Sequence, residues 1–372
     1  MTEILLKELN NNDINWLLAN GRRQTLAAGT QLVEAGKPLD YLHIVIDGSL
    51  VSTVSQIDDN PLARAFAALD DNQTAGIEIA RLSSGEIIGE FSLICMRPPA
   101  TTVTTVAKSQ ILSISILELE AKLEKEVDFA ARFYRAIAIL LSDRLEAIIS
   151  RLGRTKLAPD SSIKDVLFIF GELNDSDLDW LIANGDRQKL PANTTLIQEG
   201  CPVDALYILL SGQVSLSTTD GDRNPLKRIF AAIEAQTNIA TEVARISKGA
   251  MLGETALIDA RLPAITAKTR EEVSVLALSR SLLAAKLQQD IGFSARFYRT
   301  ISALLADRLE GMLTRLAHSR RMYHKGQTLQ AEVEYADELN SVALDRMAVA
   351  GKRFNWMLEQ SKANHSSTVA KK

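Results

Sequence analysis

Residues 85–94 read Gly85-Glu86-Ile87-Ile88-Gly89-Glu90-Phe91-Ser92-Leu93-Ile94, and residues 249–258 read Gly249-Ala250-Met251-Leu252-Gly253-Glu254-Thr255-Ala256-Leu257-Ile258. We call these two strings the first and the second cassette. In both cassettes a glycine is followed directly by a glutamate, and paired positions are separated by 164 residues. The cassettes therefore indicate an internal repeat, which has to be recognised before any fold is assigned.

The same offset holds far beyond the cassettes. It relates Trp16 to Trp180 and Gly48 to Gly212, and it continues without a gap from Glu8-Leu9-Asn10 to Arg151-Leu152. An ungapped match across strands, loops and helices identifies two copies of one domain. A chain of 372 residues, with 46% hydrophobic and 24% charged residues, is long and apolar enough to build two such cores.

The repeat sets the predicted domain boundaries. The first domain covers residues 1–156 and the second covers residues 165–318. Residues 157–164 between them are predicted to be a linker, because Pro159 and the serines that follow it break a continuing helix. Residues 319–372 have no match inside the repeats and are predicted to form a helical tail.

Each repeat is predicted to be mainly β, with helices at a few places. A short helix spans residues 12–20, and a long closing helix spans about residues 129–151. The pairs Asn60-Pro61 and Asn224-Pro225 suit the start of a helix and predict an inserted amphipathic helix in each repeat. Strands are predicted at residues 30–34, 41–46, 49–55, 77–82 and 101–116, the last of which holds two β segments.

The closing helix is predicted to be amphipathic. Its apolar residues recur at helical spacing, at Phe133, Ile137, Leu140, Leu141 and Leu145. Short strands punctuated by glycine, followed by the cassette and this helix, resemble the cyclic-nucleotide-binding domain family, which includes the cAMP receptor protein and the regulatory subunits of protein kinase A. The resemblance covers both repeats. It implies two jelly-roll-like β-rolls that each bind a cyclic nucleotide.

The resemblance also implies which residues surround the ligand. A glycine lets the backbone approach the nucleotide, and a carboxylate accepts a hydrogen bond from the ribose 2′-OH, a role that falls to Glu90 and Glu254. The residues implied at the ligand are Gly89, Glu90, Phe91, Ser92, Arg97, Ala100 and Thr102 in the first repeat, and Gly253, Glu254, Thr255, Ala256, Arg261, Ala264 and Thr266 in the second.

The sequence departs from the family at the arginine that meets the cyclic phosphate. In an ungapped alignment this position falls on Pro99 and Pro263, and the nearest arginines, Arg97 and Arg261, lie two residues earlier. A shorter loop could bring Arg97 and Arg261 to the phosphate. Alternatively, the inserted helices could supply arginine at residues 64 and 228, or the two loop arginines could be solvated charges beside a pocket without a cyclic nucleotide.

Other function classes lack support in the sequence. His43 stands alone, the remaining histidines have no metal-ligand spacing, and Cys95 and Cys201 occupy unrelated repeat positions, so we expect no catalytic residues, no metal, no cofactor and reduced thiols. The net charge of −4 divides into about +3 on the tail and about −7 on the rest of the chain. The negative charge of the two repeats is unfavourable for binding nucleic acid. The chain shows no signal-like start and no membrane-spanning run, so we expect a cytoplasmic protein without membrane insertion.

The tail is predicted to be one helix rather than a winged helix-turn-helix. Its apolar stripe consists of Val333, Ala336, Asn340, Ala343, Met347, Ala350, Phe354 and Met357. The stripe either folds back on the repeats or docks on a protein partner. Because each repeat has its own strands and helix and the tail has no match inside them, we expect deletion of residues 324–372 to change the stability of the repeats little. A partner helix would use Asn340 to set its register.

The prediction is a non-enzymatic sensor that binds a cyclic nucleotide of the cAMP or cGMP type in one or both β-rolls and signals through a protein partner. The C-terminal helix is a candidate contact for that partner. Two alternatives belong to other classes. One is a ligand-free scaffold that retains the β-roll, and the other is a DNA-binding transcription regulator. Binding of cAMP or cGMP separates the first two, and specific binding of a DNA duplex would identify the third.

Overall fold

The computed structural model describes residues 3–54, 77–152, 169–219, 240–259, 261–319 and 348–360. Several predicted features lie outside these residues. They are the two inserted helices, the linker at 157–164 and most of the tail.

The chain divides into two compact units. The first unit holds Met1–Leu141 and Leu305–Asp337, and the second holds Ser142–Leu304 and Glu338–Lys372. Each closing helix therefore begins in one unit and ends in the other. The predicted domain boundaries follow the sequence repeat, and they stay a prediction because the linker is not described.

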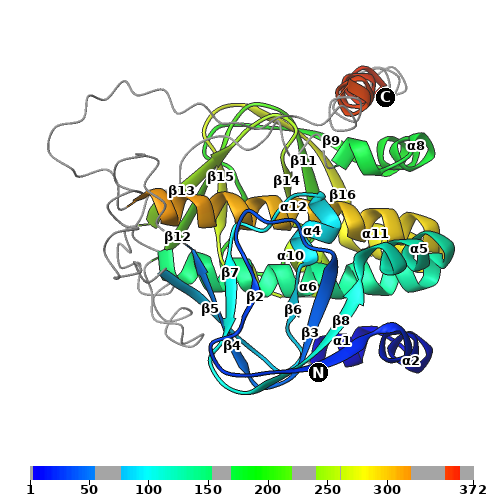
Figure 1. The fold of residues 1–372 in the computed structure, drawn as a ribbon. Coiled ribbons are helices and arrows are strands. Elements are labelled where there is room, and N and C mark those ends of the chain that lie inside the picture. Colours follow the sequence, from blue (N-terminus) through cyan, green and yellow to red (C-terminus); the bar gives the residue numbers. More distant parts are fainter. Residues whose placement is uncertain are drawn as a thin grey trace, which may run out of the picture. The chain divides into compact units, whose positions relative to one another are not determined.

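Two antiparallel four-stranded sheets build the β-roll of the first unit, as Figure 1 shows. Their strand orders are β1-β8-β3-β6 and β2-β7-β4-β5. The strands are β1 (Arg22–Leu26), β2 (Gln31–Val33), β3 (Tyr41–Asp47), β4 (Ser49–Val54), β5 (Ile77–Ser83), β6 (Ile87–Ile88), β7 (Thr102–Thr105) and β8 (Ser109–Ser115).

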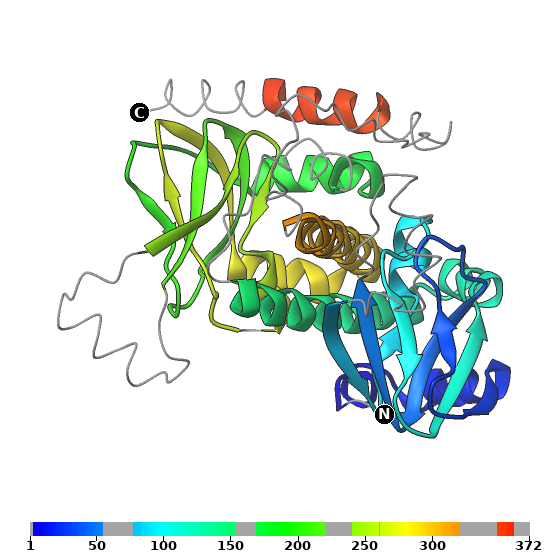
Figure 2. The same ribbon diagram turned by 60° about the vertical axis from the view of Figure 1, so that its left-hand side comes forward.

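The second unit repeats this arrangement with strand orders β9-β16-β11-β14 and β10-β15-β12-β13, seen from another side in Figure 2. Even the bulges repeat: the register shift between Ser52 and Thr53 recurs between Leu216 and Ser217. The strands are β9 (Asp186–Leu190), β10 (Thr195–Ile197), β11 (Ala205–Ser211), β12 (Val214–Thr219), β13 (Ala240–Ile246), β14 (Met251–Leu252), β15 (Thr266–Thr269) and β16 (Val273–Ser279).

Helices flank each β-roll. In sequence order, the first repeat contributes α1 (Glu3–Glu8), α2 (Asn11–Asn20), α4 (Glu90–Cys95), α5 (Ile116–Lys125) and the closing helix α6 (Val127–Leu152). The second repeat contributes α8 (Asp175–Asn184), α10 (Glu254–Asp259), α11 (Arg280–Gln289) and the closing helix α12 (Ile291–Ser319). The predicted fold class, mainly β with helices and two β-rolls, is confirmed.

The two sheets of each β-roll enclose an apolar core. In the first unit the core cluster consists of Val33, Val45, Leu50, Leu82, Ile88, Val103 and Ile111. In the second unit it consists of Ile197, Val203, Leu209, Val214, Ile246, Ala250, Leu252, Ala256, Ala267, Val273 and Val275. Because β6 and β14 contribute core residues and are followed directly by α4 and α10, the cassettes are fixed to the cores.

The helix ahead of each β-roll is fixed by a capping box and an ion pair. The Asn10 side chain accepts a hydrogen bond from the backbone N–H of Asp13, and the Asp13 carboxylate accepts one from Asn10 N–H. Arg132 of α6 then donates to Asp13 from Nε at 2.7 Å and from Nη2 at 3.1 Å. In the second unit, Arg296 of α12 binds Asp177 in the same way.

The predicted apolar face of the closing helix is confirmed, since Phe133, Ile137, Leu140, Leu141 and Leu145 are all buried. Among the residues that the structure describes, no helix is long and apolar enough to cross a membrane.

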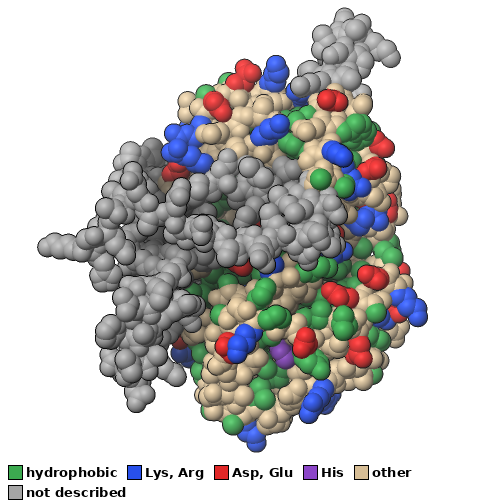
Figure 3. All heavy atoms as spheres, turned by 45° about the horizontal axis from the view of Figure 1, so that its top comes forward, with side chains coloured by type: hydrophobic (Ala, Val, Ile, Leu, Met, Phe, Trp, Pro, Cys, Tyr) green, Lys and Arg blue, Asp and Glu red, His purple; other side chains and the backbone are tan. Residues whose placement is uncertain are grey.

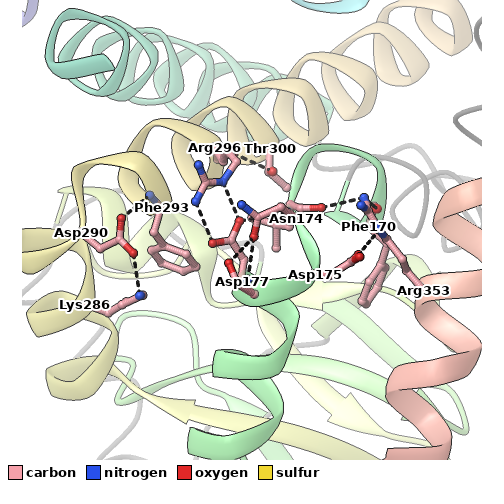
Figure 4. Close-up of polar contacts among 12 residues, drawn as sticks. Phe170, Asn174, Asp175, Asp177, Lys286, Asp290, Phe293, Arg296, Thr300 and Arg353 are labelled. Carbon is pink, nitrogen blue, oxygen red and sulfur yellow. Dashed lines mark hydrogen bonds and ion pairs between the residues drawn. The ribbon is translucent and has the colours of Figure 1, made fainter. Parts of the chain in front are cut away.

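Part of the tail packs on the second unit. Residues 348–360 form a helix, red in Figure 1, whose side chains of Ala350, Phe354 and Met357 are buried. Arg353 Nε donates to Asp175 Oδ1 at 2.8 Å at the start of α8 (Figure 4). For these residues the tail folds back on its own chain, which is the first of the two predicted alternatives.

Candidate functional site

The backbone of each cassette turns sharply at a position that only glycine can occupy without strain. Gly89 has φ +97°, and a Cβ there would lie 3.1 Å from the Tyr41 carbonyl oxygen. Gly253 has φ +88°, and its Cβ would lie 2.7 Å from the Ala205 carbonyl oxygen. Positive φ and this close backbone approach both disfavour a side chain. The turn places the next residue, a glutamate, at the start of α4 or α10.

The glutamate that follows the second glycine of each cassette is buried. Glu90 is 7% exposed and Glu254 is 4% exposed. A carboxylate is costly to bury, so a fold that buries one at the same place in both repeats holds a strong hydrogen-bond acceptor away from water. An ionised carboxylate can only accept hydrogen bonds, which suits the hydroxyl groups of a sugar.

The first cassette holds one more polar atom in its interior. Ser92 Oγ is buried and, among the described residues, has no hydrogen-bond partner. Leaving a buried hydroxyl without a partner costs about 1–3 kcal/mol, so such a group points to a ligand or another function. The second cassette has Ala256 at this position. The two sites therefore differ in their polar lining.

The loop after each cassette is tied to the turn that follows the second strand of its repeat. Pro99, at the family's arginine position, accepts a hydrogen bond from Gly36 N–H at 2.9 Å through its carbonyl. Thr102 Oγ1 accepts one from Ala35 N–H at 3.2 Å. In the second repeat the corresponding acceptors are the Pro263 carbonyl, for Gly200 N–H at 2.9 Å, and Thr266 Oγ1, for Glu199 N–H at 3.1 Å.

The structure places the other predicted residues as follows. Ala100 and Ala264 are half-buried beside those prolines. Arg97 lies against the Phe91 ring, with 5.6 Å between the guanidinium carbon and the ring centre, and also faces carboxylates of α12. Arg261 faces carboxylates of α6. The alternative arginines at residues 64 and 228 lie outside the described residues.

The carboxylates that face the two arginines were not predicted as site residues. They are Asp307 and Glu310 in the first unit and Asp143 and Glu146 in the second. The sequence carries a signal for them, because the string Asp-Arg-Leu-Glu occurs at residues 143–146 and again at 307–310.

The remaining titratable groups near the cassettes are suited to structure rather than to catalysis. Burial raises the pKa of the Cys95 thiol to about 12, so the thiol stays protonated and is a poor nucleophile. Burial lowers the pKa of His43 to about 4, and His43 Nδ1 lies 2.8 Å from Ser113 Oγ. Within the described part of the chain, no three His, Cys, Asp or Glu side chains are grouped as metal ligands.

Charges of both signs are mixed on the surface. On the face drawn in Figure 3, the visible basic and acidic side chains of the described residues lie interspersed.

A family model described as "Cyclic nucleotide-binding domain" matches residues 23–126 and 187–290, which together make up more than half of the chain. Each matched range begins in the first strand of a β-roll and ends beyond the cassette, in or just after the helix that follows the last strand.

The regulatory subunit of the cAMP-dependent protein kinase of Emericella nidulans is 25% identical over 255 residues, which cover 68% of this chain and 49% of the relative. The chain thus spans about half the length of this curated relative. Two solved structures are similar at lower identity. The regulatory domain of protein kinase A from Toxoplasma gondii, with cAMP, has 18% identity, 78% and 89% coverage of the two chains and a TM-score of 0.28.

The regulatory subunit of a cAMP-independent protein kinase A from Trypanosoma cruzi, bound to guanosine, has 17% identity, covers 77% of this chain and 81% of that one, and has a TM-score of 0.28.

Proposed function

Because this chain belongs to the cyclic nucleotide-binding domain family, we propose that its β-rolls bind a cyclic nucleotide of the cAMP or cGMP type and that it acts as a regulatory protein rather than an enzyme. The observation that carries this proposal is the pair of buried glutamates, Glu90 and Glu254, each directly after a glycine with positive φ. Both repeats thus keep a buried hydrogen-bond acceptor directly after a sharp backbone turn.

The proposed ligand contacts follow from the chemistry of the cassette. Glu90 and Glu254 accept the hydrogen bond of the ribose 2′-OH. In the first site, Ser92 adds a buried hydroxyl that can donate to or accept from the nucleotide. Arg97 and Arg261 supply the positive charge for the cyclic phosphate. Gly89, Phe91, Ala100, Thr102, Gly253, Thr255, Ala256, Ala264 and Thr266 complete the proposed lining of the two sites.

We further propose that the signal passes to a protein partner in the cytoplasm. The curated relative is a regulatory subunit of a protein kinase, and this supports a regulatory role here. A partner that binds the tail helix can use its outer side, where Val349 is 44% exposed and Trp356 is 36% exposed.

A ligand-free scaffold is the second candidate, and one observation favours it. Pro99 and Pro263 replace the family's arginine, and the nearest arginines are already engaged in ion pairs. This candidate and the sensor differ in one measurable property, which is the heat released on titration with cAMP or cGMP.

Isothermal titration calorimetry of the full chain tests the proposal. Glu90→Gln or Glu254→Gln is expected to weaken binding at its own site by about tenfold, because a neutral amide oxygen accepts the hydrogen bond of the 2′-OH less strongly than a carboxylate. Glu86→Gln in the first cassette is the matched control, since the second cassette has Ala250 there and the control should leave the affinity unchanged. Equal losses in Glu86→Gln and Glu90→Gln would reject the proposed role of Glu90.

A further inference from the structure

Within the first unit, Arg97 lies against two carboxylates. Its Nη2 donates to Asp307 Oδ1 at 3.2 Å, and its Nη1 lies 3.4 Å from Glu310 Oε2. The Asp307 side chain is 7% exposed and the Arg97 side chain 38% exposed, so the guanidinium shields a buried carboxylate. Burial alone would lower the pKa of Arg97, but the carboxylates of Glu310 and Asp307 raise it above its ordinary value.

The second unit repeats the arrangement. Arg261 forms an ion pair with Asp143, and its Nη1 lies 4.0 Å from Glu146 Oε2. Arg261 Nε also donates to Asp259 Oδ2 at 2.5 Å, a contact that has no counterpart around Arg97 because Cys95 stands at the position of Asp259 in the first repeat. The two helix carboxylates occupy the same repeat positions as those that face Arg97.

In both units the paired carboxylates lie three residues apart on a closing helix, so they share one helix face. The helix end concerned comes from the other repeat. Residues 305–319 of α12 belong to the first unit, and residues 142–152 of α6 belong to the second. Inside each compact unit, the arginine therefore links the loop after the cassette of one repeat to the closing helix of the other repeat.

On the premise that the β-rolls bind a cyclic nucleotide, we propose that these carboxylates compete with the ligand's phosphate for Arg97 and Arg261. A guanidinium binds a carboxylate or a phosphate through the same fork of N–H donors. A ligand that takes Arg97 thus releases Asp307 and Glu310, and it loosens residues 305–319 from the first cassette. The apparent affinity is the intrinsic affinity multiplied by the fraction of molecules in which the arginine is not paired with the carboxylates.

The competition is stronger in the first unit. The Asp143 side chain is 39% exposed, whereas the Asp307 side chain is 7% exposed. Water screens an exposed ion pair more than a buried one, so Asp143 holds its arginine less strongly than Asp307 does. Neutralising Asp307 should therefore raise the ligand affinity of the first site more than neutralising Asp143 raises the ligand affinity of the second site.

Calorimetry with cAMP tests this proposal in the full chain with Glu254→Gln, which weakens the second site. Adding Asp307→Asn and Glu310→Gln is expected to tighten binding at the first site by about threefold to tenfold, because the built-in competitor is lost. Adding Arg97→Ala instead should weaken binding by about tenfold. Glu118→Gln, an exposed carboxylate on α5, is the matched control and should leave the affinity unchanged.

Hydrogen exchange provides a second readout that does not depend on affinity. Saturating cAMP should increase the exchange of residues 305–313 of α12 in the wild type, and it should not do so in Arg97→Ala. If the wild type binds cAMP but the neutralised variant binds no more tightly, the competition is refuted while the proposed function stands. If neither the wild type nor any variant binds, the proposed function fails and the competition fails with it.

Discussion

Replacing Phe354 with alanine is expected to lower the free energy of unfolding of the second unit by about 3 kcal/mol, the usual cost of removing a buried phenylalanine side chain. Phe354 is 5% exposed, and its ring centre lies 5.1 Å from that of Phe170. Lys248 Nζ lies 5.3 Å from the centre of the Phe354 ring. The substitution removes both contacts and leaves a cavity beneath the tail helix.

The neighbouring Arg353 explains why this helix sits at the start of α8. Besides Asp175, it donates from Nη1 to the carbonyl oxygens of Phe170 at 3.1 Å and Leu173 at 2.8 Å (Figure 4). Deleting the tail would remove all of these contacts, so we now expect deletion to destabilise the second unit, contrary to the expectation from the sequence alone.

Hydrogen exchange at increasing urea concentration measures the effect of Phe354→Ala. Peptides from α8 should lose protection, and peptides from α2 should not, because the tail helix belongs to the second unit. Val349→Ala on the exposed side of the same helix is the control, since Val349 is 44% exposed. Unchanged protection of α8 in Phe354→Ala would show that the tail helix adds nothing to the second unit.

Acidification is expected to destabilise the first unit through His43. Its imidazole is 7% exposed, and burial lowers its pKa from 6.5 to about 4. As the pH falls below 6.5, the unfolded chain takes up a proton that the folded chain does not, so stability is lost. The loss amounts to about 2 kcal/mol at pH 5 relative to neutral pH, and it grows until the pH falls below the folded-state pKa.

The variant His43→Phe replaces the titrating imidazole of β3 with an aromatic ring that does not titrate. The second unit serves as an internal control, because Tyr207 stands at the equivalent position. The measurement compares urea unfolding of the first unit at pH 7 and pH 5 by hydrogen exchange. A loss of the same size in His43→Phe and in the wild type would assign the acid sensitivity to other groups.

Much of the fold could be predicted because the repeat makes every pattern appear twice. The predicted strands at 41–46 and 77–82 correspond to β3 and β5, and the predicted helix at 12–20 corresponds to α2 (Asn11–Asn20). These elements have clear apolar periodicity or a glycine at their ends, and local sequence alone specifies them.

One strand that was missed owes its structure to tertiary contacts. β1 has the sequence Arg22-Arg23-Gln24-Thr25-Leu26, which lacks the alternation of a strand, and it forms because it pairs along its length with β8. α5 follows β8 directly and was not predicted as a separate helix.

In the candidate site, too, only the residues that local sequence specifies could be predicted. Glu90 and Glu254 could be found from the cassette string, because their position depends on a local turn. The carboxylates facing Arg97 and Arg261 lie in a repeated string, but nothing in the sequence links that string to the arginines, because Arg97 and Asp307 are 210 residues apart. Only the exchange of helix ends between the two repeats brings them together in one unit.

Native mass spectrometry of the full chain with cAMP and cGMP tests most directly whether both β-rolls bind a cyclic nucleotide. We expect mass increases that correspond to one and two bound ligand molecules. In the Glu90→Gln variant the species with two ligands should decrease at the same ligand concentration. The absence of any ligand-bound species at near-millimolar cAMP and cGMP would contradict the account and leave two β-rolls that serve as a scaffold.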